Sequence, residues 1–105
     1  MNKIMLVCSA GMSTSMLVSR MLKAAKEENI NVAIFAKPAA EADEILESEK
    51  ITLVLLGPQV KFLENKYKDN YLKKGIKIAV INMQDYGMMD GKKVLKDAML
   101  MIKGE

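Results

Sequence analysis

Residues 4–15 read IMLVCSAGMSTS and form the first structural unit that can be recognised in the chain. The first five are all apolar, which is typical of a short strand buried on both faces of a parallel sheet. Residues 9–15 are mostly small and hydroxylated, and apolar residues at helical spacing follow them, namely Leu17, Val18, Met21, Leu22 and Ala25. Ser13 or Thr14 is a natural N-cap for this helix. The stretch therefore predicts a strand, a tight loop and a helix, with Cys8 as the last residue of the strand.

Further apolar runs and helical patterns alternate along the rest of the chain. Strands are expected at residues 32–36, 51–56 and 76–81, helices at 39–48, 59–73 and 94–102, and a loop at 82–91. The turns are marked by Pro38, Gly57, Pro58 and Gly75. Within the helix 59–73, the residues expected to face the core are Val60, Leu63, Tyr67, Tyr71 and Leu72.

This alternation predicts a three-layer α/β sandwich, in which a four-stranded parallel sheet is covered by helices on both faces. A chain of 105 residues with 50% hydrophobic content suits one compact domain, residues 1–105. In such sheets a ligand binds outside the carboxyl ends of the strands, where the strand order reverses. The rim at this edge is expected to consist of residues 8–15, 37–39, 57–59 and 82–91.

The scarce residue types exclude several kinds of site. The chain has one Cys and no His, so a histidine general base, a phosphohistidine, an internal disulfide and the commonest zinc sites are excluded, and no metal is expected. Arg20 is the only arginine and aromatic residues make up 5% of the chain, which argues against nucleic-acid binding. No apolar run reaches the roughly 18 residues that span a bilayer. Four apolar residues before Cys8 are too few for a signal peptide, so a cytoplasmic location is expected.

The loop after the first strand has the features of an anion site. Amides in the first turn of a helix lack internal partners and carry the positive end of the helix dipole, so they bind anions. The residues expected to bind a phosphoryl group are Ser9, Ala10, Gly11, Met12, Ser13, Thr14 and Ser15, through their amides and with the last three hydroxyls as helpers. The same field favours the thiolate, which is the nucleophilic form of cysteine. The alternative is that Cys8 is only the last buried residue of a core strand.

Residues 8–15, CSAGMSTS, resemble the signature loop of the cytoplasmic enzyme IIB of the lactose/cellobiose class of the bacterial sugar phosphotransferase system. The resemblance extends over essentially the whole chain. Residues 55–59 (LLGPQ) resemble that family's third strand and turn. Residues 86–87 and 90–91 resemble its fourth-strand loop, and residues 94–95 the opening of its last helix.

The resemblance implies a phosphotransferase in which Cys8 carries the phosphoryl group. Cys8 would accept it from a histidine of a separate enzyme IIA and pass it to a sugar bound in the membrane permease, enzyme IIC. No cofactor is implied, and the partners are these two proteins rather than nucleic acid or the lipid bilayer. A free-standing IIB of this class indicates cellobiose, chitobiose or a related disaccharide as the sugar.

Two other classes of protein share the strand, anion loop and helix. Low-molecular-weight tyrosine phosphatases have this unit with an arginine six residues after the cysteine, where the chain has Thr14. The guanidinium fork that clamps a phosphoryl group in those hydrolases is therefore missing. A flavodoxin-like module that binds phosphate or flavin is the second alternative, although the chain has no Trp to stack on a flavin.

Several residues of the segment 82–91 are candidates for contacts near Cys8. Asp85 lies near the position of the acid in such a phosphatase, but it is interpreted as a solvated loop carboxylate. Tyr86 is expected to pack over the loop or to contact a partner. Met88, together with Met12 and Met89, is expected to meet partner proteins at the rim, because flexible methionines suit a surface with two dissimilar partners.

Overall fold

The structure is a computed structural model that describes residues 1–9 and 13–104, with only the backbone described for Ser13. Its elements, in chain order, are β1 (Asn2–Cys8), α1 (Ser13–Glu27), β2 (Val32–Pro38), α2 (Ala39–Ser48), β3 (Leu53–Leu56), η1 (Pro58–Leu63), α3 (Glu64–Tyr71), η2 (Leu72–Lys74), β4 (Lys77–Val80), α4 (Met83–Gly87) and α5 (Gly91–Lys103). The predicted alternation of strands and helices is confirmed.

The four strands form one parallel sheet in the order β2-β1-β3-β4, as predicted. From β1 the chain moves to β2 at one edge of the sheet, and then crosses back over β1 to reach β3. The strand order therefore reverses between β1 and β3. The carboxyl ends of these two strands, which carry Cys8 and lead into Gly57, are where a sheet of this kind offers room for a ligand.

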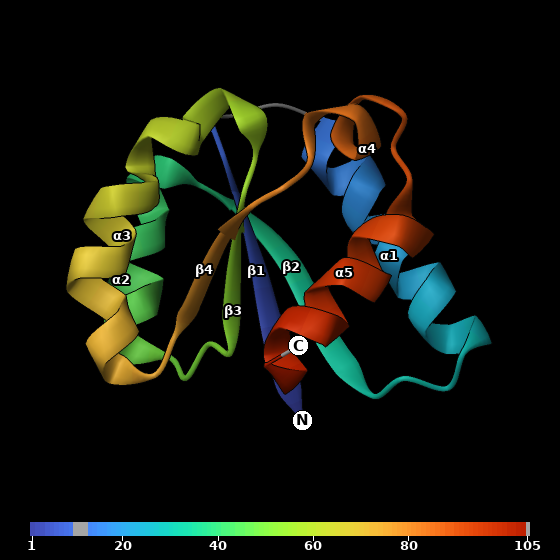
Figure 1. Cartoon of the computed structure of the whole chain (residues 1–105), viewed down its shortest axis with the longest axis horizontal. Coiled ribbons are helices and arrows are strands. Elements are labelled where there is room, and N and C mark those ends of the chain that lie inside the picture. The colour runs from blue at the N-terminus through green and yellow to red at the C-terminus, as the bar shows by residue number, and fades with distance from the viewer. Residues whose placement is uncertain (10–12, 105) are drawn as a thin grey trace.

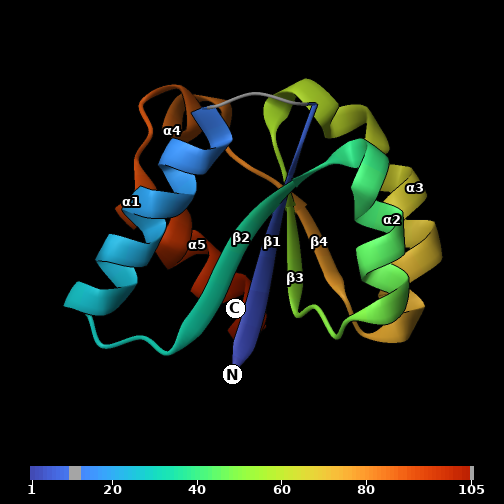
Figure 2. The same cartoon turned by 180° about the vertical axis from the view of Figure 1, so that it is seen from behind.

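Alternate residues of β1 supply two separate apolar cores, one on each face of the sheet. Ile4 and Leu6 pack with residues of α1 and α5, whereas Met5 and Val7 pack with residues of α2 and α3. All four side chains are completely buried. Figures 1 and 2 show α1 and α5 together on one side of the sheet and α2 and α3 on the other. The three-layer arrangement is confirmed, and burial on both faces explains why the strand is continuously apolar.

The prediction of one helix over residues 59–73 is wrong, because this segment is divided into η1, α3 and η2. Val60 leaves helical geometry, with φ of −120°, and its side chain is buried. At the other end, the helix tightens into the 3₁₀ turn η2, which Gly75 closes at φ of 86°. The change from an α-helical to a 3₁₀ period turns Leu72 outward, where it is 49% exposed rather than in the core.

The expectation of a loop over residues 82–91 is also wrong, because this segment contains α4. The side-chain oxygen of Asn82 caps α4 by accepting a hydrogen bond from the amide of Asp85 at 3.0 Å. Asp90 caps α5 in the same way, accepting from the amide of Lys93 at 3.1 Å. A five-residue helix is too short to show an apolar period, so the asparagine cap is its main signal in the sequence.

Candidate functional site

Cys8 is held at the carboxyl end of β1, between the ends of its two neighbouring strands. Its thiol donates a weak hydrogen bond to the carbonyl oxygen of Lys37 on β2, with Sγ and oxygen 3.9 Å apart. On the β3 side, the amide of Gly57 donates to the carbonyl oxygen of Val7 at 2.9 Å. Cys8 is 7% exposed, and among the described residues it belongs to neither apolar core. The cysteine is thus the last buried residue of the strand, at the place where the strand order reverses.

The loop that was assigned to phosphate binding is described only in part. Ala10, Gly11 and Met12 lie outside the described residues. Ser9 and Ser15 are exposed, whereas Thr14 is 2% exposed. α1 begins at Ser13, and Figure 1 shows its start beside α4, at the edge of the molecule where β1 and β3 end. The unpaired amides of the first turn of α1 are therefore at the same edge as the thiol.

Tyr86 on α4 is bonded to the start of α1, whereas its expected packing over the loop involves residues 10–12, which lie outside the described residues. Its hydroxyl oxygen lies 3.0 Å from Oγ1 of Thr14, and the tyrosine is 7% exposed. Arg20 makes a second link between the same segments, because its guanidinium donates to the carbonyl oxygen of Met89 at 3.1 Å. Met89 itself is in the left-handed region, with φ of 53°. The segment after β4 is thus tied to α1 at two places.

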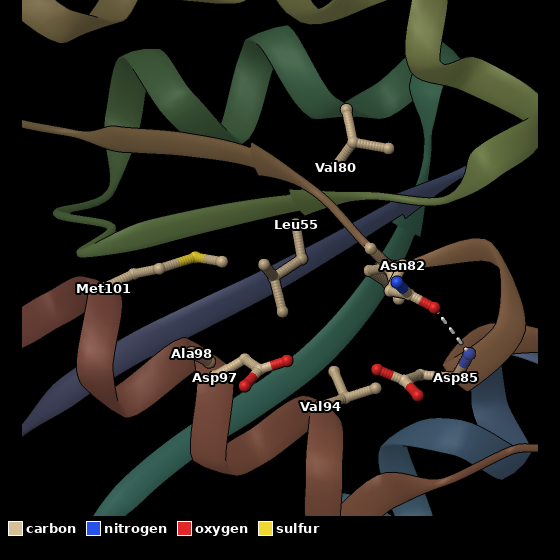
Figure 3. A pocket seen from close by; sticks show the side chains of 9 residues that line it. Leu55, Val80, Asn82, Asp85, Val94, Asp97, Ala98 and Met101 are labelled. Atoms are coloured by element: carbon tan, nitrogen blue, oxygen red, sulfur yellow. Dashed lines mark hydrogen bonds between the residues drawn. The ribbon is translucent and has the colours of Figure 1, made fainter. Parts of the chain in front are cut away.

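Asp85 is not a solvated loop carboxylate, because it belongs to α4 and its side chain is only 17% exposed. Figure 3 shows Asp85 and Asp97 facing a pocket whose remaining lining residues are Leu55, Val80, Ile81, Asn82, Val94, Ala98 and Met101. The ammonium of Lys93 lies 3.6 Å from Asp85 and 2.7 Å from Asp97. Asp85 is therefore engaged on the α5 side of its helix, and this arrangement does not favour it as the acid of a cysteine-dependent hydrolase.

Large apolar side chains are exposed at the edge of the molecule that carries Cys8. Met88 is 65% exposed, and its contact with partner proteins stays a prediction. The sequence analysis missed three others, namely Met16 on α1 (54%), Phe62 on η1 (76%) and Met83 on α4 (66%). These four side chains are called the apolar rim below. Single exposed apolar residues are common on protein surfaces, so the sequence carries no clear signal for Met16, Phe62 and Met83.

Other features of the described residues lie away from Cys8. Burial, with Asp43 nearby, raises the pKa values of Tyr67 and Tyr71 on the α2–α3 side. A hydrogen bond to Asp97 raises the pKa of Lys93. In residues 1–9 and 13–104, no three Cys, Asp or Glu side chains are grouped so that they could hold a metal ion. The helices of this part of the chain include none that is both long and apolar enough to span a bilayer.

The fold and the site define a class of protein, namely parallel α/β domains that place a cysteine beside a helix N-terminus at the strand-reversal point. Residues 3–97 match the family model described as the lactose/cellobiose-specific IIB subunit of the PTS system, and the chain belongs to that family. The chain is therefore a phosphocarrier component of a sugar phosphotransferase system, and components of this kind work with EIIA and EIIC. The hydrolase alternative is not favoured.

Similar proteins match this chain over most of their length, and two solved structures share its fold. The chain is 49% identical over 98 residues to a galactose-specific EIIB component of Lactococcus lactis subsp. cremoris, covering 90% of this chain and 91% of that protein. It is 48% identical, with the same coverage, to a cellobiose-specific EIIB component of Lactococcus lactis subsp. lactis. The solution structure of a cellobiose-specific IIB component from Borrelia burgdorferi matches with a TM-score of 0.77 and 43% identity, covering 98% of this chain and 93% of the other. A lactose-specific IIB domain from Streptococcus pneumoniae, at 19% identity, matches in fold with a TM-score of 0.79 over 93% and 94% of the two chains.

Proposed function

We propose that Cys8 is the residue on which this phosphocarrier holds the phosphoryl group. The observation that carries the proposal is the position of Cys8 at the end of β1, with only residues 9–12 between it and α1. Amides at the start of a helix stabilise both a thiolate and a phosphoryl group bound to it. Because the chain contains no histidine, the phosphohistidine that supplies the group belongs to the donor, enzyme IIA.

The chemistry consists of two in-line displacements at phosphorus. In the first, the Cys8 thiolate attacks the phosphohistidine, a P–S bond forms, and the P–N bond breaks with its electron pair going to the imidazole nitrogen. In the second, a hydroxyl of the sugar attacks, the P–S bond breaks with its electron pair returning to sulfur, and the hydroxyl proton passes to solvent or to a base at the sugar site. Both displacements need alignment and charge neutralisation more than proton transfer. The activity is that of a protein-phosphocysteine–sugar phosphotransferase.

The backbone amides of residues 9–15 are proposed to bind the transferred group. Fixed amides suit this role because a phosphoryl group on sulfur carries about two negative charges, and they need no reorganisation during transfer. Ser15 is exposed in the first turn of α1, so its hydroxyl is free to assist. The hydroxyl of Thr14 is already bonded to Tyr86, so of the two described hydroxyls that of Ser15 is the better helper.

The sugar is proposed to be cellobiose, chitobiose or a related disaccharide, bound in enzyme IIC rather than by this chain. The names of the relatives support this class, since they include cellobiose-specific and oligo-β-mannoside-specific EIIB components, the latter from Bacillus subtilis at 39% identity over 99 residues. Work of this kind takes place in the cytoplasm, with a transient visit to the inner face of the membrane where the permease presents its sugar.

The experiment is reconstituted sugar phosphorylation. Phosphoenolpyruvate, the upstream carriers, enzyme IIA and membranes that contain enzyme IIC are combined with this protein, and sugar phosphate is measured for cellobiose and chitobiose. The wild type is expected to support phosphorylation, Cys8→Ser to reduce it to background, and Ser15→Ala to retain most of it because the amide remains. Activity of Cys8→Ser would overturn the proposal, and so would release of free phosphate in the absence of enzyme IIC, which would indicate a phosphatase.

A further inference from the structure

Thr14 and Tyr86 are 72 residues apart in the sequence and share a buried hydrogen bond. The two hydroxyl oxygens are 3.0 Å apart, and the residues are 2% and 7% exposed. Thr14 lies in the first turn of α1, and Tyr86 lies on α4. Loss of the Tyr86 hydroxyl would take this hydrogen bond from the buried Thr14 hydroxyl, at a cost comparable to that of a desolvated polar group. The pair therefore fixes the place at which α4 meets the start of α1.

The ring of Tyr86 also adjoins the turn after β3. A Cβ atom placed on Gly57 would lie 3.7 Å from Cε1 of Tyr86 and 3.4 Å from the carbonyl oxygen of Val7. Val7 precedes the proposed phosphocysteine, and the amide of Gly57 donates to its carbonyl oxygen at 2.9 Å. The hydroxyl of Tyr86 thus bonds to the start of α1, while its ring lies on the side of Gly57 where a side chain would begin, next to the turn that borders the end of β1.

From these contacts we propose that Tyr86 is a positioning residue for phosphoryl transfer, acting through the Thr14 hydroxyl to set the first turn of α1 relative to Cys8. The inference rests on the proposed role of Cys8. In-line displacement is sensitive to misplacement of the reacting group, and amides neutralise charge best when they are preorganised. A tyrosine that locks the helix start, without touching the phosphoryl group, would supply that preorganisation.

The test is the single-turnover rate of phosphoryl transfer to this protein from enzyme IIA phosphorylated with phosphoenolpyruvate and the upstream carriers. Tyr86→Phe retains the ring and removes the hydroxyl. Its maximal rate is expected to fall by about three- to tenfold, the range for one neutral hydrogen bond. The concentration of enzyme IIA at half-maximal rate should stay within about twofold of the wild type, because the buried hydroxyl does not contribute to docking. A merely structural role of Tyr86 would not lower the maximal rate while leaving the half-maximal concentration of enzyme IIA unchanged.

Three further variants make the test specific to the hydrogen bond. Thr14→Val should also lower the maximal rate, and the double variant Thr14→Val/Tyr86→Phe should lose less than the two single losses combined, since both single changes remove the Thr14–Tyr86 hydrogen bond. Thr14→Ser keeps the hydroxyl and should restore the rate. The matched control is Tyr71→Phe, which removes a buried tyrosine hydroxyl bonded to Asp43 at 2.8 Å on the α2–α3 face, and should leave the rate unchanged.

The outcomes distinguish this inference from the function on which it rests. A wild type that takes up no phosphoryl group would overturn both. If the wild type takes up the phosphoryl group, and Tyr86→Phe and Thr14→Val do so at the same maximal rate, only the positioning role is overturned. Additive losses in the double variant, or an equal loss in Tyr71→Phe, would likewise contradict it. If Tyr86→Phe does not fold, the comparison of Thr14→Val with Thr14→Ser decides the matter.

Discussion

At the scale of single residues, Tyr71 illustrates how a polar group is accommodated in an apolar face of the sheet. Its ring packs edge-on against Tyr67, with centroids 5.7 Å apart, and is almost fully buried. Its hydroxyl donates to Asp43 on α2 at 2.8 Å, so the tyrosine joins α3 to α2. Burial first, and then the bond to Asp43, raises the pKa of Tyr71. The residue therefore stays protonated in the folded protein at pH values where an unfolded tyrosine ionises.

This shift predicts a loss of stability in alkali that depends on Tyr71. Above the ordinary tyrosine pKa of about 10, the unfolded chain loses the proton and the folded chain keeps it, so the free energy of unfolding falls as pH rises, by about 1.4 kcal/mol per pH unit for this group. Below about pH 10 the wild type should be more stable than Tyr71→Phe, and the difference should narrow above it. Urea unfolding across this range measures the effect, and parallel pH curves for the two proteins would contradict it.

At the scale of elements, the close approach of α1 and α5 depends on Gly91. A Cβ atom at this position would lie 2.6 Å from both the Cβ and the carbonyl carbon of Arg20, and 2.7 Å from the amide nitrogen of Met21. Two of these three atoms are backbone, so they cannot move aside without shifting the helix. Asp90 caps the start of α5, and the hydrogen bond from Arg20 to Met89 joins α1 to the segment just before α5. Gly91 therefore lies where the two helices are held close together.

Gly91→Ala is therefore expected to destabilise the fold by about 1–3 kcal/mol, the usual cost of overpacking. Chemical denaturation measures it. The matched control is Gly87→Ala on α4, where nothing lies within 4 Å of an added Cβ, and this variant should be neutral or slightly stabilised because alanine favours a helix. Equal stability of Gly91→Ala and wild type would show that α1 and α5 can separate freely at this point.

Hydrophobic patterning predicted some of the elements and not others. Fully apolar runs located β1 and β3, because strands buried on both faces have no polar face to interrupt them. Patterning failed where local geometry departs from a regular period, as at Val60 and Leu72 around α3. It also failed after β4, where the chain forms the short helix α4 instead of the expected loop. Hydrophobic patterning could not predict the hydrogen bond between Thr14 and Tyr86, because such a contact depends on how two helices pack on one face of the sheet.

At the scale of the whole molecule, the thiol of Cys8 and the exposed apolar rim belong to the same edge of the sheet. The interior strand carries Cys8 to this edge, and the exposed side chains of the apolar rim come from α1 (Met16), η1 (Phe62), α4 (Met83) and the residue after α4 (Met88). Flexible apolar side chains adapt to unlike partners. The rim is therefore suited to enzyme IIA as donor and then to enzyme IIC as acceptor.

Replacing Met88 with Ser should weaken docking without changing the chemistry at Cys8. The concentration of phosphorylated enzyme IIA needed for half-maximal transfer is expected to rise by about three- to thirtyfold, and the maximal rate to stay close to that of the wild type. Leu72→Ser is the matched control, since Leu72 is also half exposed but lies before β4 at the opposite edge of the sheet. If the wild type and Met88→Ser need the same concentration of phosphorylated enzyme IIA for half-maximal transfer, Met88 does not take part in docking.

The most direct test of the central claim is the intact mass of the protein after incubation with phosphoenolpyruvate, the upstream carriers and enzyme IIA, without enzyme IIC. One phosphoryl group is expected on the wild type, located on Cys8 by fragmentation, and none on a Cys8→Ala variant of the same thermal stability. A phosphoryl group found on another residue, or retained in Cys8→Ala, would contradict the assignment of Cys8 as the carrier.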